Sequence, residues 1–302
     1  MIEIVSVSPK FKVLNLELPG AGYLEFVAAY LFRGEKAAII DIGPKALVPE
    51  VLSAVSQLGV SSPEFEYIIL THIHLDHAGG VGTLIKEMPN AKVVAHSRAR
   101  PHLIDPAMLW EASLKTLGDV PLQYGQLEPV PADKIIDAAD GMKLDLGAGL
   151  TLEVLLTPGH ASHHLSLFDR ANSVLIAGEA AGINMDGLIR PNTPPPFRLE
   201  DGLASLDRLI ALQPQKLCYA HFGCYDNGVQ RLKASHEQLI AWYELVKSAT
   251  EAGKSPQEIL SLLREKDKNL VYLERVSGYK LDREKGQLIN TILGLAGSAK
   301  KT

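Results

Sequence analysis

Apolar and polar stretches alternate over the first 42 residues in a way that is typical of antiparallel β-strands. A polar turn with a glycine, Arg33 to Lys36, separates the last two apolar runs. The pattern therefore predicts a β-meander at the start of the chain. Its strands are expected at Ile2–Val7, Phe11–Leu18, Phe26–Phe32 and Ala37–Ile42.

Strand and helix patterns then follow one another along the chain. Pro44 to Leu58 has helical spacing with a proline near its start, and Gly79 to Met88 is a second expected helix. This alternation is typical of an α/β fold. Further strands are expected at Tyr67–Leu70, Ala91–Ala95, Met142–Leu144, Leu150–Leu156, Leu165–Phe168, Val174–Gly178 and Lys216–Ala220.

A segment rich in proline interrupts this order near residue 190. Pro191 and Pro194 to Pro196 lie within Asn184 to Arg198, and proline cannot donate a backbone hydrogen bond. The whole segment is therefore expected to lack regular structure. A helix is expected after it, over Leu199–Leu212.

Four side chains that bind metals well follow one strand within six residues. They are His72, His74, Asp76 and His77, directly after the apolar run Tyr67–Leu70. His72 and His74 are two residues apart and can aim at one point, while Asp76 and His77 can turn toward a second point. Burying several imidazoles together without a metal would be costly. The spacing therefore predicts two adjacent metal ions.

The motif His72-x-His74-x-Asp76-His77 after a strand resembles the signature of the metallo-β-lactamase-fold hydrolases. That superfamily includes glyoxalase II, the lactonases and RNase Z. The resemblance implies an α/β fold of the αββα type, a sandwich of two mixed β-sheets flanked by helices. It also implies a metal pair at the strand ends and hydrolysis by a metal-bound hydroxide.

Three later strands each deliver one further residue that the resemblance identifies as a ligand. His160 lies in a Thr-Pro-Gly-His segment like that of glyoxalase II relatives, and His221 follows the last strand. Glu179 stands where the family normally has an aspartate that bridges the metals, so the carboxylate here has a stem longer by one methylene. The implied first site is His72, His74 and His160, and the second is Asp76, His77 and His221, with Glu179 as the bridging acid.

The ligand set has no thiolate, so it suits two divalent metal ions, with zinc as the first choice and iron or manganese as alternatives. In the implied mechanism Asp76 is the catalytic residue that orients the nucleophile. Asp41 also leaves a strand end and is expected to support a ligand rather than bind metal. His163 and His164 begin a strand, and one of them is expected to hydrogen-bond a metal ligand.

The last quarter of the chain changes character from mixed to helical. We therefore expect a catalytic domain over residues 1–226 and a C-terminal helical extension over residues 227–302. Ser255-Pro256-Gln257-Glu258 has the residues of a helix N-terminal capping box. The extension could cover the active site, recognise substrate or form a homodimer interface.

Composition and charge narrow the expected partners. The net charge is −5 and the pI is near 6.1, which does not favour a nucleic-acid partner. No apolar stretch reaches the roughly 18 residues of a membrane span, and the first residues have no basic start or long apolar core. A cytoplasmic protein with no membrane partner is expected. Cys218 and Cys224 are six residues apart, which matches neither a zinc nor a redox spacing, so they are expected to be free thiols.

The function that follows is hydrolysis of a thioester, ester or lactone in a small acyl substrate. Phosphodiester hydrolysis in the manner of RNase Z is an alternative, but it would favour a basic exosite that the composition does not show. A mononuclear iron oxygenase is another. A metal-stabilised signalling protein with weak catalysis also stays open, because Glu179 departs from the family pattern.

Overall fold

The computed structural model describes residues 2–20, 26–185, 187–221 and 223–299. Its backbone contacts divide the chain into two units. The first unit comprises residues 1–21, 26–156 and 165–174, and the second comprises residues 22–25, 157–164 and 175–302. Each unit is described on its own.

The first unit is built on a mixed seven-stranded sheet in which neighbouring strands are also consecutive in the chain. The first four strands pair antiparallel, as the meander pattern predicts, and strands β4 to β7 pair parallel. The strands are β1 (Glu3–Ser8), β2 (Phe11–Leu16), β3 (Val27–Arg33), β4 (Ala37–Ile40), β5 (Phe65–Ile69), β6 (Lys92–His96) and β7 (Ile135–Ala138).

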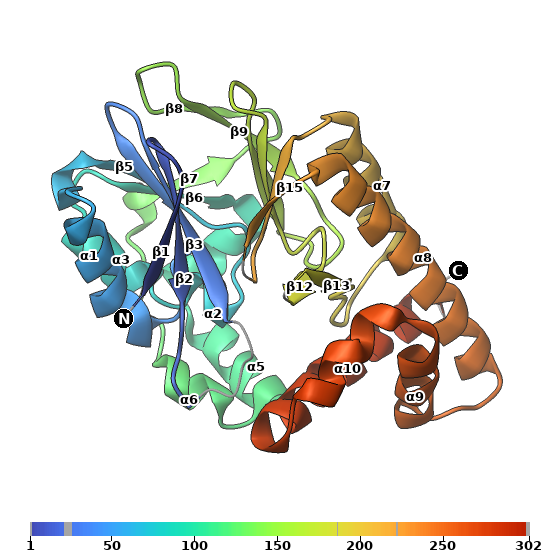
Figure 1. Ribbon diagram of the computed structural model, residues 1–302. Helices are drawn as coiled ribbons and strands as arrows, with labels where there is room; N and C mark the ends of the chain where they lie inside the picture. Colours follow the sequence, from blue (N-terminus) through green and yellow to red (C-terminus); the bar gives the residue numbers. More distant parts are fainter. Residues whose placement is uncertain (1, 21–25, 186, 222, 300–302) are drawn as a thin grey trace. The chain divides into compact units, whose positions relative to one another are not determined.

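Helices connect the parallel strands, because a parallel pair needs a long crossover rather than a tight turn. Helices α1 and α3 lie beside this sheet in Figure 1. Every residue of β4 is buried, which explains why that strand reads as a continuous apolar run rather than an alternating one. The helices of the first unit are α1 (Val48–Gln57), α2 (Leu75–Ala78), α3 (Val81–Glu87), α4 (Arg100–Ile104), α5 (Ala107–Leu117) and α6 (Val120–Tyr124).

A second group of strands in the first unit is antiparallel. It comprises β8 (Lys143–Asp145), β9 (Thr151–Leu156) and β10 (Leu165–Asp169). The carbonyl oxygen of Leu146 accepts hydrogen bonds from the backbone amides of Glu35 and Lys36, at 2.8 and 3.0 Å. The turn between β3 and β4 is thereby tied to the loop that follows β8.

The second unit combines short strands with long helices. Helix α10 packs against both α8 and α9, as Figure 1 shows. Its strands are β11 (Val174–Gly178, whose first residue is in the first unit), β12 (Ile183–Met185), β13 (Leu188–Arg190), β14 (Lys216–Tyr219) and β15 (Cys224–Asp226). Its helices are α7 (Leu199–Ala211), α8 (Gly228–Glu251), α9 (Pro256–Lys266) and α10 (Gly278–Ala299), with a 3-10 helix over Lys268–Arg275.

One expectation about this unit is wrong. Residues 184–198 do not all lack regular structure, because β12 and β13 form an antiparallel hairpin before the first proline. Both strands have only three residues, too few for an alternating pattern to be visible. The capping box at α9 is confirmed: Glu258 bonds to the amide of Ser255, and the Ser255 hydroxyl accepts from the Glu258 amide.

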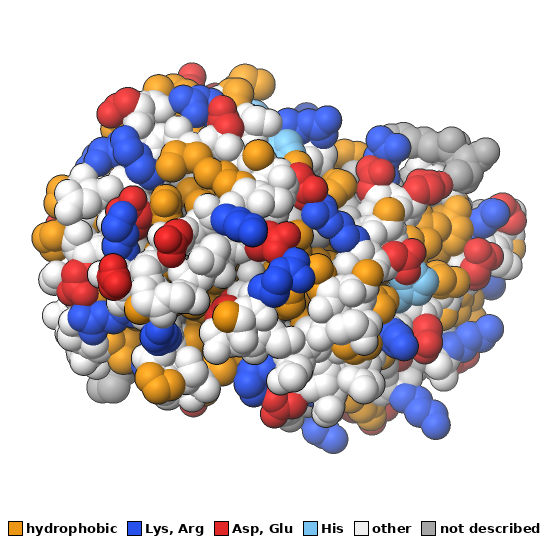
Figure 2. Space-filling view, turned by 90° about the horizontal axis from the view of Figure 1, so that it is seen from above, with side chains coloured by type: hydrophobic (Ala, Val, Ile, Leu, Met, Phe, Trp, Pro, Cys, Tyr) orange, Lys and Arg blue, Asp and Glu red, His pale blue; other side chains and the backbone are white. Residues whose placement is uncertain are grey.

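The surface carries both signs of charge. On the face that Figure 2 shows, Lys and Arg side chains are interspersed with Asp and Glu. Within the part of the chain that the structure describes, none of the helices has the length and apolar character to cross a membrane.

Candidate metal centre

The first unit places four predicted ligands together at the carboxyl end of β5. His74 immediately precedes the short helix α2, which carries Asp76 and His77. His72 and His77 are buried, while His74 and Asp76 are half-buried. The short run between a strand and a one-turn helix thus brings all four to one location.

The ring nitrogens of this group face one another. His72 Nε2 lies 2.9 Å from His74 Nδ1, and the centroids of the His72 and His77 rings are 4.3 Å apart. Asp76 Oδ2 lies 3.5 Å from His77 Nε2. Imidazole nitrogens and a carboxylate that converge in this way are typical of a metal-binding cluster.

Asp41 fixes the orientation of two of these rings. Its Oδ1 accepts from the Thr71 amide at 2.8 Å, and its Oδ2 accepts from the Thr71 hydroxyl at 2.7 Å and from His77 Nδ1 at 3.0 Å. Because the Thr71 hydroxyl donates to Asp41, it accepts from His72 Nδ1, which lies 3.0 Å away. One buried carboxylate therefore holds the Nδ1 proton on His77 directly and on His72 through Thr71.

The consequence is that His72 and His77 both keep a lone pair on Nε2. Histidines that bind metals usually donate their other ring nitrogen to such a carboxylate or oxygen. Asp41 thus makes the hydrogen bond to His77 that is expected of a residue supporting a predicted ligand. Asp41 has a φ of +48°, a left-handed conformation that aspartate and asparagine tolerate better than most residues.

The second unit contributes the other three predicted ligands. His160 lies in the turn 157–164, Glu179 follows β11, and His221 follows β14. All three are buried. The Ala220 amide donates to the Gly178 carbonyl at 3.2 Å, so the two residues that directly precede His221 and Glu179 in the chain are joined.

The Glu179 carboxylate connects the two histidines. Its Oε2 lies 2.5 Å from His160 Nε2, and its Oε1 lies 3.0 Å from His221 Nε2. Oε1 also accepts from Asn192 Nδ2 at 2.6 Å. The longer stem of glutamate thus still allows one carboxylate to reach both predicted imidazole ligands of this unit.

His164 hydrogen-bonds the backbone of Glu179. The Glu179 amide donates to His164 Nε2 at 3.0 Å, so that nitrogen carries no proton. His164 Nδ1 must then donate to the Thr157 hydroxyl, 2.8 Å away. Of the 163–164 pair, His164 thus hydrogen-bonds the backbone of a predicted ligand residue.

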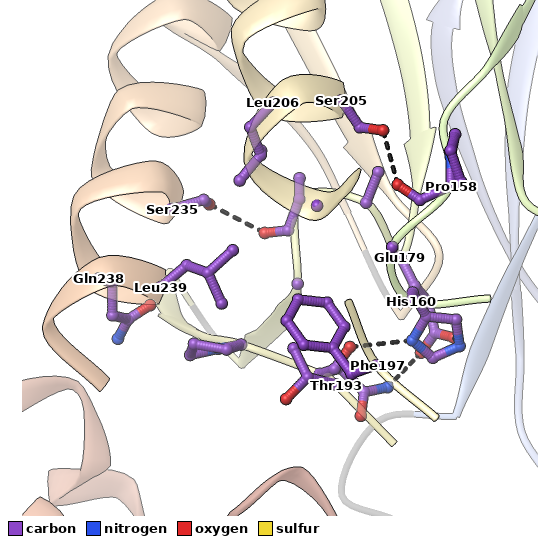
Figure 3. Close-up of a pocket in the computed structure, with 17 residues that line it drawn as sticks. Pro158, His160, Glu179, Thr193, Phe197, Ser205, Leu206, Ser235, Gln238 and Leu239 are labelled. Atoms are coloured by element: carbon purple, nitrogen blue, oxygen red, sulfur yellow. Dashed lines mark hydrogen bonds and ion pairs between the residues drawn. The ribbon is translucent and has the colours of Figure 1, made fainter. Parts of the chain in front are cut away.

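Helices α7 and α8 hold the turns that carry these ligands (Figure 3). Ser205 of α7 donates to the Pro158 carbonyl at 2.6 Å, and Ser235 of α8 donates to the Ala181 carbonyl at 2.8 Å. A cavity of about 20 Å³, enough for one water molecule, lies beside the ligands. Its walls include Phe197, Leu206 and Leu239.

Two glycines, Gly159 and Gly202, allow α7 to pack closely against the turn that carries His160. Gly159 has a φ of +147°, and a Cβ there would lie 2.7 Å from the Cα of Gly202 in α7. A side chain at Gly159 would therefore push the His160 turn away from the helix.

The donor atoms fit a divalent metal ion. His160 Nδ1 lies 2.9 Å from the Asn192 carbonyl oxygen, which can only accept. A neutral His160 ring therefore presents a lone pair, rather than an N–H, to the Glu179 carboxylate. A cation held by both groups would relieve their repulsion, and nitrogen and oxygen donors of this kind suit zinc, iron and manganese.

Two other histidines, His96 and His236, are not among the predicted ligands. His96 Nδ1 accepts from the Arg98 amide, and His236 pairs with Asp207 at 3.3 Å. Both cysteines are free, as predicted. The register of β14 and β15 nevertheless places Cys218 directly opposite Cys224, which their spacing in the sequence did not indicate.

Comparison with known proteins identifies relatives of this chain. A model of the Metallo-beta-lactamase superfamily matches residues 22–221. The metallo-beta-lactamase fold-containing protein ST1585 of Sulfurisphaera tokodaii is 34% identical over 211 residues, which cover 67% of this chain and 76% of that protein. A hydroxyacylglutathione hydrolase of Aeromonas hydrophila is 28% identical over 192 residues, covering 63% of this chain and 58% of the relative.

The structural comparison agrees with the sequence comparison. The metallo-beta-lactamase family protein TTHA1429 of Thermus thermophilus superposes with a TM-score of 0.72 at 24% identity, over 98% of this chain and 95% of that one. This likeness confirms the predicted α/β class and the metallo-β-lactamase fold, with helices following it at the C-terminus.

Proposed function

The chain belongs to the metallo-beta-lactamase superfamily, and we propose that it is a metal-dependent hydrolase of thioesters, esters or lactones. The similarity to a hydroxyacylglutathione hydrolase supports an acyl compound as substrate. Cytoplasmic location, the absence of nucleic-acid and membrane partners, and a homodimer through the C-terminal helices stay predictions.

We propose that the seven predicted ligands bind two divalent metal ions, zinc in the first instance. The division of roles follows the family resemblance. His72, His74 and His160 would hold one ion, Asp76, His77 and His221 the other, and Glu179 both.

A metal ion lowers the pKa of a bound water to about 7 and polarises a carbonyl oxygen, so hydrolysis at neutral pH needs no side-chain base. The protein residues keep the ligand nitrogens unprotonated and oriented. Asp41 does so for His72 and His77, and the Asn192 carbonyl does so for His160. Asp76 would orient the nucleophile.

The observation that carries the proposal is this control of ring protonation. Three buried histidines, His72, His77 and His160, each donate an Nδ1 proton to an oxygen. In each of them the unprotonated Nε2 faces another predicted ligand. Histidines that bind metals almost always donate their other ring nitrogen to an oxygen in this way.

The first experiment is metal analysis of protein purified without added metal. About two ions per chain are expected, with zinc predominant. His160→Ala and His221→Ala should each lower that number. His236→Ala is the matched control, because its partner Asp207 lies outside both ligand groups, and it should bind as many ions as the wild type.

The second experiment separates the reaction classes. The enzyme is expected to hydrolyse a p-nitrophenyl ester and an acyl-glutathione thioester faster than bis-p-nitrophenyl phosphate. Glu179→Asp should lower turnover, because the shorter stem would lose contact with His160 or His221. A preference for the phosphodiester, or oxygen consumption by iron-loaded protein without hydrolysis, would refute the assignment. So would a strong rise in turnover with Glu179→Asp.

A further inference from the structure

Asn192 contacts two predicted ligands at once. Its side-chain amide donates to Glu179 Oε1 at 2.6 Å, and its backbone carbonyl accepts from His160 Nδ1 at 2.9 Å. Figure 3 shows the His160 ring and the Glu179 carboxylate facing each other where these bonds meet. Asn192 is in neither predicted ligand set, and nothing in the spacing of the sequence singled it out.

The residue two positions before Asn192 is anchored on helix α10. Arg190 is 1% exposed, and its guanidinium donates through Nε and one Nη to Glu284 Oε1, both at 2.8 Å. The same Nη donates to Gln287 Oε1 at 2.8 Å. Burial is the largest single influence and disfavours the charged guanidinium, but Glu284 and Tyr272 together outweigh burial and raise the pKa of Arg190. The ion pair is therefore a fixed attachment between β13 and α10.

The residue after Asn192 is anchored on the same helix. The Thr193 hydroxyl donates to the Thr291 carbonyl at 3.1 Å. The Thr193 carbonyl lies against Gly294, where a Cβ would overlap the carbonyl oxygen and come within 3.1 Å of the Pro194 carbonyl carbon. Glycine costs a helix about 1 kcal/mol relative to alanine, so a glycine at this contact has a packing reason.

Two other glycines of α10 provide a contrast. A Cβ at Gly286 or at Gly297 would meet nothing within 4 Å. Of these three glycines, only Gly294 lies where the helix must approach the segment that carries Asn192.

We propose that Asn192 is a positioning residue for Glu179 and His160, and that α10 sets the metal affinity of this ligand pair by holding Asn192 through Arg190 and Thr193. The proposal rests on metal binding as given under the proposed function. The proposal also explains how a glutamate, Glu179, can stand where the family normally has an aspartate. Glutamate has one more rotatable bond than the aspartate normal in this family, and the Asn192 amide removes the added freedom of the carboxylate.

This assigns the C-terminal helix a role that differs from a lid, a substrate-recognition element or a dimer interface. The contacts described above join its residues to Arg190 and Thr193. They act through a segment of four residues, 190–193, whose two ends they fix.

The direct test is Asn192→Ala, which removes the amide donor and keeps the backbone carbonyl that holds His160. The affinity for Zn²⁺, measured by competition with a chromophoric chelator, is expected to fall 10- to 100-fold. The thermal midpoint of the metal-free protein should change little. The visible spectrum of the Co²⁺-loaded protein should also change, because the carboxylate is no longer fixed.

The remote test compares glycines on one helix. Gly294→Ala should lower Zn²⁺ affinity in the same direction as Asn192→Ala, because the new methyl group displaces the Thr193 carbonyl. Gly286→Ala is the matched control and should keep wild-type affinity. If Gly294→Ala does not fold, Thr193→Val takes its place, because it removes the hydroxyl that donates to the Thr291 carbonyl of α10. Wild-type affinity in that variant would overturn the role of α10.

The outcomes distinguish this inference from the proposed function. A wild-type protein that binds no Zn²⁺ would overturn both. A wild-type protein that binds Zn²⁺ tightly while Asn192→Ala binds it equally well, with an unchanged Co²⁺ spectrum, would overturn the positioning role alone. Equal affinities of folded Gly294→Ala and Gly286→Ala would overturn the role of α10.

Discussion

Asp41→Asn tests whether one buried carboxylate controls the protonation of two ligand histidines. Asparagine has the same shape and also tolerates the left-handed backbone at this position, where φ is +48°. The substitution therefore changes one oxygen into an NH₂ group and leaves the backbone unstrained. If the remaining oxygen faces the Thr71 amide, the NH₂ group faces the Thr71 hydroxyl and His77 Nδ1.

The magnitude follows from the bonds that are lost. A hydrogen bond to a charged group contributes about 1.5–3 kcal/mol. The new NH₂ group and the Nδ1–H of His77 would both be donors, so His77 must move its proton from Nδ1 to Nε2. The Nε2 atom then has no lone pair for a metal. A loss of about 1.4–2.8 kcal/mol corresponds to a 10- to 100-fold weaker metal affinity, which is also the range usual for residues that orient metal ligands.

Chelator competition with Zn²⁺ measures the affinity, and ¹⁵N chemical shifts of the imidazoles report which nitrogen of His77 is protonated. Asp137→Asn is the matched control. It makes the same chemical change on β7 of the same sheet, at a side chain that is 48% exposed and paired with Arg100. The reasoning is refuted if Asp41→Asn binds Zn²⁺ within twofold of the wild type while His77 keeps its proton on Nδ1.

Three further predictions concern stability. Hydrogen bonds from Lys45 and Lys86 lower the pKa of Glu128 to about 2. The contribution of Glu128 to the free energy of unfolding is therefore present above pH 4.5 and is lost as the pH falls toward 2. Since Lys86 is exposed and Lys45 is half-buried, solvent screens both pairs, and urea titrations should show the wild type losing about 0.5–1 kcal/mol more than Glu128→Gln over that range. Ser255→Ala removes the capping box of α9 and should lower the free energy of unfolding by about 1 kcal/mol, measured by denaturant titration; no change would contradict the cap. Trp242→Phe removes the indole donor to Asp267 and should cost about 1.5–3 kcal/mol by circular dichroism melts, whereas an unchanged midpoint would show that this bond contributes nothing.

Most of the fold could be predicted because its signals are local. The strands of the meander are apolar runs set apart by polar turns, and each predicted ligand group follows an apolar strand run. The short strands β12 and β13 were missed because three residues cannot display a period. The seven ligand residues came from the family motif, since their spacing alone predicts a metal pair only for the first four.

The residues that hydrogen-bond the predicted ligands were harder to predict from the sequence. Asp41 could be anticipated because it ends a strand beside the motif. Asn192 could not, because its segment has no periodic pattern and its partners Glu179 and His160 are 13 and 32 residues away. The attachment of Arg190 to Glu284 spans 94 residues, and no local pattern encodes a contact at that separation.

The order of the seven-stranded sheet has a consequence for how the protein is made. Each strand from β1 to β7 pairs with the strand next to it in the chain, so each new strand joins a sheet whose other strands all precede it in the sequence. A ribosome delivering the chain from its N-terminus could thus complete this sheet strand by strand, without waiting for later residues. Pulse-labelled hydrogen exchange on arrested nascent chains would then find β1 to β4 protected before β7 has emerged, and simultaneous protection of all seven would contradict such an order.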